Sequence, residues 1–422
     1  MKKALFCFLM FAVLWTVPCF SANEASPKND PNHYSGTDSE RIAAAVQYGS
    51  AHGGIVRIPA RLPDKEANRN CWLLDSAILL SNRTTLILEN CKIKLSDQCR
   101  DNFIRSANCG IGIEKPAPLE EIHILGIGQS ELIGADHPRS TGDGNKILGQ
   151  RSYGTDAGKP NESQKGDWRN IGILFANVKN FSIQNLTVRQ AHCWAISLEK
   201  CSCGKVSDIV FDATEVRTID GTAVKTLNQD GLDLRKGCHN IMIENISGNT
   251  GDDLVALTAI RISEKKGGTL EATEVAETDP NAMNDIHHIT IRNVIGHSKG
   301  GHQLVRFLNA SGMRIHHVLL DGLIDTSPED LAAHAAVRIG DSNPSWGGIT
   351  PLGDTYGLTI INIQSRAKAA ILIAGSLTDS IIANVINYHP DVKGITYGSG
   401  KDNVKNVVIG PFLNAERTSN LK

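Results

Sequence analysis

Residues 358–385 read LTIINI-QSRAKAAILIAGSLTD-SIIANV, so two short apolar runs with an internal asparagine follow one another. Thr359 in the first run and Ile381 in the second are 22 residues apart, and Val404 follows after 23. Runs of the same kind begin at Ile122, Phe181, Asp208, Asn240, His288, His317 and Lys405. A period of about 22 to 24 residues, with strands and no helical pattern between them, predicts a parallel β-helix. A propeller blade needs about 40 to 45 residues, which disfavours that alternative.

A helix and a strand are predicted ahead of these coils. Asp38 or Ser39 can cap a helix over residues 41–48, and Gly53-Gly54 ends it. The run Ile-Val-Arg-Ile-Pro at 55–59 is then a strand. Because an open solenoid end exposes strand edges, we expect this helix to cover it.

The N-terminus predicts export. Met1-Lys2-Lys3 and the apolar residues 4–18 have the pattern of a signal peptide. We therefore expect a signal peptide over residues 1–22, a flexible lead-in over 23–34 and one β-helix domain over 35–422, located outside the cell or in the periplasm. A lipid anchor on Cys19 is the alternative.

Charge and hydropathy exclude several classes of partner. With 43 basic and 45 acidic residues the net charge is −2, which predicts no binding to nucleic acid. No later segment has the roughly 18 apolar residues of a membrane span. We expect a monomer that needs no cofactor and holds no metal. The eight cysteines after residue 22 fit either disulfides or buried thiols, and the pairs His287-His288 and His316-His317 are expected to be solvated turn residues.

Two acidic segments indicate chemistry: NQDGLD at 228–233 and GDDLVAL at 251–257. Asp252 stands 22 residues after Asp230, or one coil, and neighbouring coils stack about 4.8 Å apart. Asp230 should therefore lie beside the pair Asp252-Asp253, and crowding should raise the proton affinity of one carboxyl. Both members of the pair can face outward only where the strand is bulged or ends. The alternative is that these are ordinary turn residues.

At these segments the chain resembles the polygalacturonase-like glycoside hydrolases of family 28, in the pectin-lyase-like superfamily of right-handed parallel β-helices. The two acidic segments match the family's Asn-Thr-Asp-Gly-x-Asp and Gly-Asp-Asp motifs. Gly301-His302-Gln303 is similar to its Gly-His-Gly, and residues 338–340, Arg-Ile-Gly, to its Arg-Ile-Lys. Cys193-Trp194-Ala195 and the entry segment 37–59 add to the likeness, which covers most of the chain.

The resemblance implies hydrolysis of a pectic polysaccharide with inversion. Asp252 would be the general acid, while Asp230 and Asp253 would activate water and His302 would assist. The residues expected to bind substrate are Asn228, Asp233, Gln303, Arg306 and Arg338.

Two departures from the family bear on the substrate. Gly340 replaces the lysine that, with the arginine, grips a galacturonate carboxylate, so plain polygalacturonate should be a weak substrate unless Lys299 or Arg306 compensates. The 49 residues from Asp253 to His302 imply an inserted loop that narrows the groove. Insertions are expected at 134–167 and 264–285, and Trp168, Trp194 and Trp346 either stack on sugars or cap coils.

Two other functions stay open. A calcium-dependent polysaccharide lyase on the same solenoid could use the carboxylates as metal ligands. A non-catalytic, glycan-binding β-helix is the second, although binding a sugar does not require crowded carboxylates.

Overall fold

The computed structural model describes the chain from Lys28 to Asn414 with several gaps. The described residues are 28–63, 69–97, 99, 101–110, 113, 115–136, 167–214, 216–219, 222–226, 228–260, 283–310, 312–390 and 394–414. The expected signal peptide lies outside them, as do most of the two expected insertions. Within the expected lead-in, residues 31–33 form the short 3-10 helix η1 (Pro31–His33).

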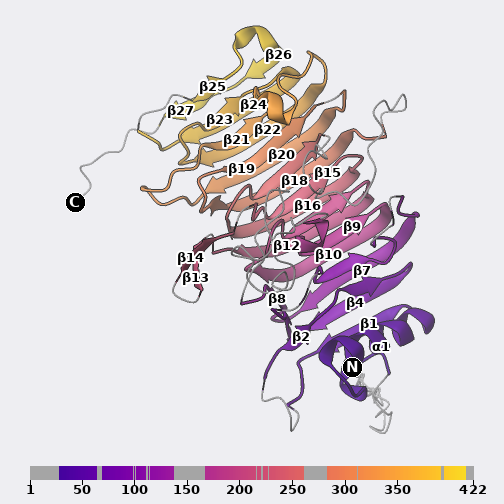
Figure 1. Cartoon of the computed structure of the whole chain (residues 1–422). Coiled ribbons are helices and arrows are strands. Elements are labelled where there is room, and N and C mark those ends of the chain that lie inside the picture. Colours follow the sequence, from indigo (N-terminus) through magenta and orange to yellow (C-terminus); the bar gives the residue numbers. More distant parts are fainter. Residues whose placement is uncertain are drawn as a thin grey trace, which may run out of the picture.

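Two long parallel sheets run the length of the solenoid (Figure 1). The 15-stranded sheet, here sheet A, consists of β1 (Ile55–Pro59), β2 (Trp72–Leu74), β4 (Thr84–Glu89), β5 (Lys92–Leu95), β7 (Leu119–Ile127), β8 (Glu131–Ile133), β10 (Val178–Arg189), β12 (Ser202–Asp212), β16 (His239–Thr250), β18 (Ile286–Ser298), β20 (Ile315–Asp325), β22 (Thr355–Ser365), β24 (Leu377–Asn387), β26 (Val404–Ile409) and β27 (Phe412–Asn414).

The 10-stranded sheet, here sheet B, consists of β3 (Ile78–Leu80), β6 (Ile104–Ser106), β9 (Ile173–Ala176), β11 (Ile196–Glu199), β15 (Leu232–Arg235), β17 (Val255–Ala259), β19 (Gln303–Asn309), β21 (Ala335–Ile339), β23 (Ile371–Ile373) and β25 (Ile395–Tyr397). The remaining described elements are the hairpin β13 (Val216–Ile219) with β14 (Thr222–Lys225), the helix α1 (Asp38–Ala51) and the 3-10 helices η2 (Asp167–Asn170), η3 (Pro344–Trp346) and η4 (Lys401–Asn403).

The parallel β-helix expected from the sequence is confirmed. Each coil contributes strands to both sheets, and successive coils pair in parallel from β1 to β26. Alternate side chains point inward: in β4 the buried and partly buried residues alternate strictly. The inward side chains of both sheets form one continuous apolar core. Six of the eight cysteines are buried, which favours the buried-thiol alternative.

Ladders of asparagine and aspartate side chains join the coils at the bends of sheet A. Asn245 donates to Asp208 Oδ1 at 2.9 Å, and Asn293 donates to Asn245 Oδ1 at 3.1 Å. These three residues have φ between 55° and 59°, the left-handed region in which Asn and Asp are tolerated best among non-glycine residues. The asparagine inside each apolar run is therefore a bend residue.

The expected period is right for most coils and wrong for the last. Thr359 pairs with Ile381, as the 22-residue period predicts. Ile381 pairs with Val408 and not with Val404, so the last coil is 27 residues long. The extra residues contain β25 and η4, which the apolar pattern alone does not reveal.

Helix α1 begins earlier than expected. Thr37 is its N-cap and forms a capping box with Glu40, so the predicted capping role of Asp38 or Ser39 is wrong. Asp38 is instead 3% exposed and accepts two hydrogen bonds from Arg61 Nε, both at 3.0 Å. It also accepts from the backbone of Leu73 at 2.9 Å, which ties the helix to β2.

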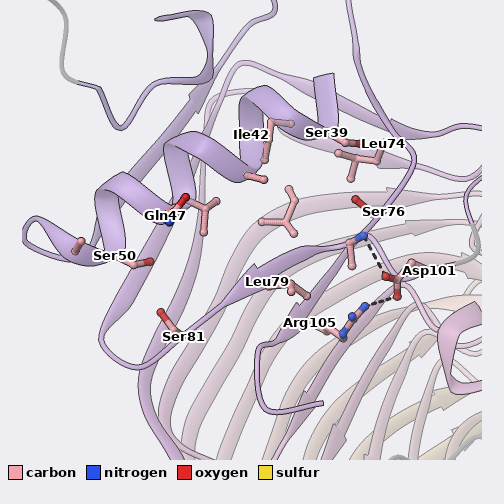
Figure 2. Close-up of a pocket in the computed structure, with 15 residues that line it drawn as sticks. Ser39, Ile42, Gln47, Ser50, Leu74, Ser76, Leu79, Ser81, Asp101 and Arg105 are labelled. Atoms are coloured by element: carbon pink, nitrogen blue, oxygen red, sulfur yellow. Dashed lines mark hydrogen bonds and ion pairs between the residues drawn. The ribbon is translucent and has the colours of Figure 1, made fainter. Parts of the chain in front are cut away.

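The helix covers the first coil incompletely. A pocket of about 640 Å³ remains between α1 and the first strands of both sheets (Figure 2). Its lining includes Ile42 and Val46 from the helix and Leu79 from β3, with Asp101 and Arg105 paired at one side. The candidate catalytic residues are not among the residues that line it.

We predict that Asp38→Ala lowers the free energy of unfolding by about 3 kcal/mol, because it leaves the buried Arg61 guanidinium without its carboxylate. Thermal or urea unfolding followed by circular dichroism measures this. The matched control is Asp136→Ala, whose carboxylate is 66% exposed and pairs with Lys94 at 2.6 Å, and it should cost less than about 1 kcal/mol. Equal losses in the two variants would contradict the anchoring role of Asp38.

Candidate active site

The acidic residues of both motifs lie just before strands of sheet B. Asp230 precedes β15 by two residues, and Asp252-Asp253 forms the bend before β17. The pair therefore lies outside a regular strand, as its outward orientation requires. Leu232 pairs with Val255, so this coil has 23 residues, and the backbone of Gly231 donates to Asp253 O at 2.9 Å. The residue aligned with Asp230 is thus Asp253, one position later than the sequence spacing predicts.

The three carboxylates converge. One oxygen atom from each of Asp230, Asp252 and Asp253 lies within 4.8 Å of the other two. Asp230 and Asp253 are buried, at 8% and 2% exposed, whereas Asp252 is partly exposed. Burial, followed by the negative charge of Asp252, raises the pKa of Asp230 well above its ordinary value.

Asp233 adds a fourth carboxylate behind the cluster. It lies on β15 and is 1% exposed. Burial raises its pKa, an effect that the charge of Arg235 opposes and that of Asp253 reinforces. Asn228, at the start of the same motif, is partly buried with a φ of 51°. The structure therefore gathers the acidic residues of both motifs in one region.

His302 and Gln303 reach the cluster from the next coil. His302 Nδ1 is 3.3 Å from Asp252 Oδ1, and its side chain is 45% exposed. Gln303 is buried and donates its backbone N–H to Asp253 Oδ1 at 3.0 Å. Gln303 thus holds a catalytic candidate through its backbone, while His302 faces the solvent side of the cluster.

Two arginines follow on successive strands of sheet B. Arg306 and Arg338 are register partners on β19 and β21. Arg306 lies 3.5 Å from Asp253 Oδ2, and both guanidinium groups contact Asp341 Oδ2, at 3.0 and 2.8 Å. Two positive and two negative charges therefore balance within the protein. Asp341 was missed at the sequence level, although it directly follows the Arg-Ile-Gly segment.

The missing lysine is a property of the backbone at Gly340. Gly340 has a φ of 70°, and a Cβ atom there would lie 2.5 Å from Gly375 Cα. Any side chain at this position is strained, so a lysine cannot be restored here without moving the chain. Of the two cations expected to compensate, Arg306 is in the site, whereas Lys299 Nζ bonds to the carbonyl of Ala213 at 2.6 Å.

One of the three tryptophans lies beside these arginines. Trp346 is 39% exposed, and Arg306 Cζ is 5.8 Å from its ring centroid. Trp194 is 6% exposed with Arg235 Cζ 4.6 Å from its ring centroid, and it packs in a cluster with Trp168. Trp346 is therefore the tryptophan best placed to stack on a sugar ring.

Comparison with known proteins confirms the resemblance drawn from the motifs. Residues 139–269, which contain both acidic segments, match the model of the glycosyl hydrolases family 28. This match supports glycosidase activity at the level of the family. No curated protein matches the chain in sequence.

Solved structures confirm the right-handed parallel β-helix fold. A polygalacturonase from Erwinia carotovora superposes with a TM-score of 0.53 at 15% identity, covering 94% of this chain and 98% of its own. An exopolygalacturonase from Thermotoga maritima gives 0.54 at 12%, covering 90% and 91%. The tailspike protein of E. coli bacteriophage HK620 gives 0.53 at 16%, covering 90% and 64%. Within the described residues, no helix is long and apolar enough to cross a membrane.

We predict that Asp230→Asn raises the melting temperature at pH 7 by about 1–3 °C while it abolishes most activity. The raised pKa means that the folded state binds this proton more tightly than the unfolded chain, so ionising Asp230 costs stability as pH rises above 3.8. The gain should therefore vanish below pH 3.8. Calorimetry across pH measures it, with the exposed Asp330→Asn as control. A loss of stability at pH 7 would contradict this electrostatic reading.

Proposed function

We propose that this protein is an exported, monomeric glycoside hydrolase that cleaves a pectic polysaccharide, with Asp230, Asp252, Asp253 and His302 as its catalytic residues. The observation that carries the proposal is the convergence of two acidic motifs, with an exposed histidine, on one face of a solenoid. Buried, crowded carboxylates cost stability, so their presence points to chemistry and not to packing. The match of residues 139–269 to family 28 supports the reaction class.

The exposures suggest how the work is divided. Asp252 is the most exposed of the three acids and contacts His302, so it is best placed to protonate a glycosidic oxygen. Asp230 and Asp253 lie deeper and would hold the attacking water. Because the three carboxylates interact, their protons belong to the cluster as a whole. The charge of His302 when protonated would favour the ionised form of Asp252, so a neutral His302 suits the acid role.

The stereochemistry is a point on which two arguments differ. Inverting enzymes usually hold their two carboxyl groups about 6.5–9.5 Å apart, and retaining enzymes about 5–5.5 Å apart. The oxygen atoms here lie within 4.8 Å, nearer the retaining geometry, whereas the family resemblance implies inversion. We propose inversion, with water held by two acids on one side of the sugar. Proton NMR of the first anomer released decides between the two outcomes.

The balanced arginines suggest a substrate with little negative charge at this subsite. Arg306 and Arg338 already share Asp341 and leave no net positive charge for a galacturonate carboxylate. We therefore propose a neutral or branched pectic glycan, such as a rhamnogalacturonan, in preference to plain polygalacturonate. Arg306, Arg338, Asn228, Asp233 and Gln303 are its proposed binding residues. Product analysis on a panel of pectic fractions tests the substrate class.

A calcium-dependent lyase is the second candidate, because three carboxylate oxygens within 4.8 Å could also hold a hard cation. Arg306 already provides positive charge 3.5 Å from Asp253, which favours the hydrolase. A lyase releases an unsaturated, ultraviolet-absorbing product and loses activity with a chelator. A hydrolase releases a plain reducing end and keeps its activity.

We predict that Asp252→Asn lowers turnover by about two to four orders of magnitude on a natural glycan, since the amide cannot donate the proton. On an aryl glycoside with a good leaving group the loss should shrink, because departure no longer needs protonation. Asp230→Asn and Asp253→Asn remove water activation, so their losses should persist on both substrates. Initial rates on the two substrates measure the difference, and three variants of near-native activity would refute the proposed cluster.

We also predict that Asp341→Asn lowers the KM for polygalacturonate about 3- to 10-fold, because it frees positive charge on Arg306 and Arg338. The KM for a neutral pectic side chain should stay unchanged and serves as the control. A parallel change on both substrates would mean that Asp341 supports the fold of the site and not its charge.

A further inference from the structure

A double row of aromatic rings lies on sheet A, outside the candidate active site. Neighbouring rings of the first row, at the starts of β16, β18, β20 and β22, have centroids 4.9, 5.0 and 4.8 Å apart. A second row of two rings stands beside it, 5.0 Å apart. The first row is His239, His287, His316 and Tyr356, and the second is His288 and His317.

The backbone directs both members of each histidine pair to the same side. Successive residues of a regular strand face opposite ways. His288 and His317, however, have φ values of 54° and 53°, in the left-handed region. Each ring therefore turns toward its neighbour in sequence. His287 Nδ1 lies 2.7 Å from His288 Nδ1, and His316 Nδ1 lies 2.7 Å from His317 Nδ1.

Two imidazole nitrogens at 2.7 Å need something positive between their lone pairs, either a shared proton or a metal ion. At His316 the other ring nitrogen, Nε2, is 3.8 Å from Asp285 Oδ2, and Asp285 is 3% exposed. A carboxylate at that nitrogen favours the tautomer with the proton on Nε2, which leaves a lone pair on Nδ1. A carboxylate behind a histidine is the usual outer arrangement of histidines that bind metals.

We propose that His316 and His317 chelate a divalent late transition metal ion, Cu²⁺, Ni²⁺ or Zn²⁺, through their Nδ1 atoms, and that His287 and His288 form a second such site one coil away. Imidazole donors select these ions, and Cu²⁺ binds most strongly among them. Each pair supplies two nitrogen ligands, and water completes the coordination.

Protons compete little for these sites. Burial, and then the neighbouring histidines, lower the pKa of His287 and of His316 to about 4. Both rings are therefore neutral at pH 7, the form that binds a metal. The aspartate cluster is a different kind of site, because its oxygen donors suit harder cations.

The chain offers a replacement that spares the fold. Asn240 stands one coil before His288 in the same column and has a φ of 55°. His288→Asn and His317→Asn therefore keep a residue that tolerates this conformation while they remove one ligand from each pair. His52→Asn is the matched control, since His52 is an exposed histidine on the far side of α1 in the sequence, bonded to the carbonyl of Tyr48.

The test is a Cu²⁺ titration of the full chain by calorimetry at pH 7, with electron paramagnetic resonance of the bound ion. We expect binding with nitrogen hyperfine structure, at least a tenfold weaker affinity at the altered pair in each single variant, and loss of both sites in the double variant. The His52→Asn control should bind as the parent does, and glycan hydrolysis should be unchanged in all three. No binding by the parent, or equal binding by the double variant, would overturn the proposal and leave each pair sharing a proton.

Discussion

The structure depends on one constraint, the parallel register that backbone hydrogen bonds impose between successive coils. Once Leu232 is paired with Val255 and Val255 with Val305, every outward side chain of sheet B has a fixed neighbour one coil away. Residues 20 to 50 positions apart in the chain then stand about 4.8 Å apart in space. The carboxylate cluster, the arginine pair and the histidine rows are all consequences of this stacking.

The same constraint explains what the sequence could predict. A repeated apolar run with an internal asparagine predicts the coil, because the inward positions must be apolar and the bend favours a residue that tolerates positive φ. The convergence of Asp230 with Asp252-Asp253 followed from their spacing. What the sequence could not supply was the exact length of each coil. A bend may absorb an extra residue without changing the apolar pattern, so Asp253 and not Asp252 is aligned with Asp230, and the last coil is 27 residues long.

Contacts between polar side chains were also beyond the reach of pattern. Asp341 follows a recognisable segment, yet its role in joining Arg306 to Arg338 depends on side-chain directions that no spacing rule gives. Asp38 was expected to cap a helix, and it instead holds a buried guanidinium contributed by a residue 23 positions later. The paired histidines were expected to be separate turn residues, because only the left-handed φ of the second residue brings the two rings together.

This division between inward and outward positions bears on how far the fold speaks for function. The polygalacturonase from Erwinia carotovora shares only 15% of its residues with this chain over 94% of the length, and a phage tailspike superposes about as well. Register, apolar interior and bend residues are enough to build such a solenoid, and many sequences satisfy them. The outward columns of sheet B are free of those demands, so they can change while the fold persists. The charge balance around Arg306, Arg338 and Asp341 is therefore a better guide to the substrate than the likeness of the backbone.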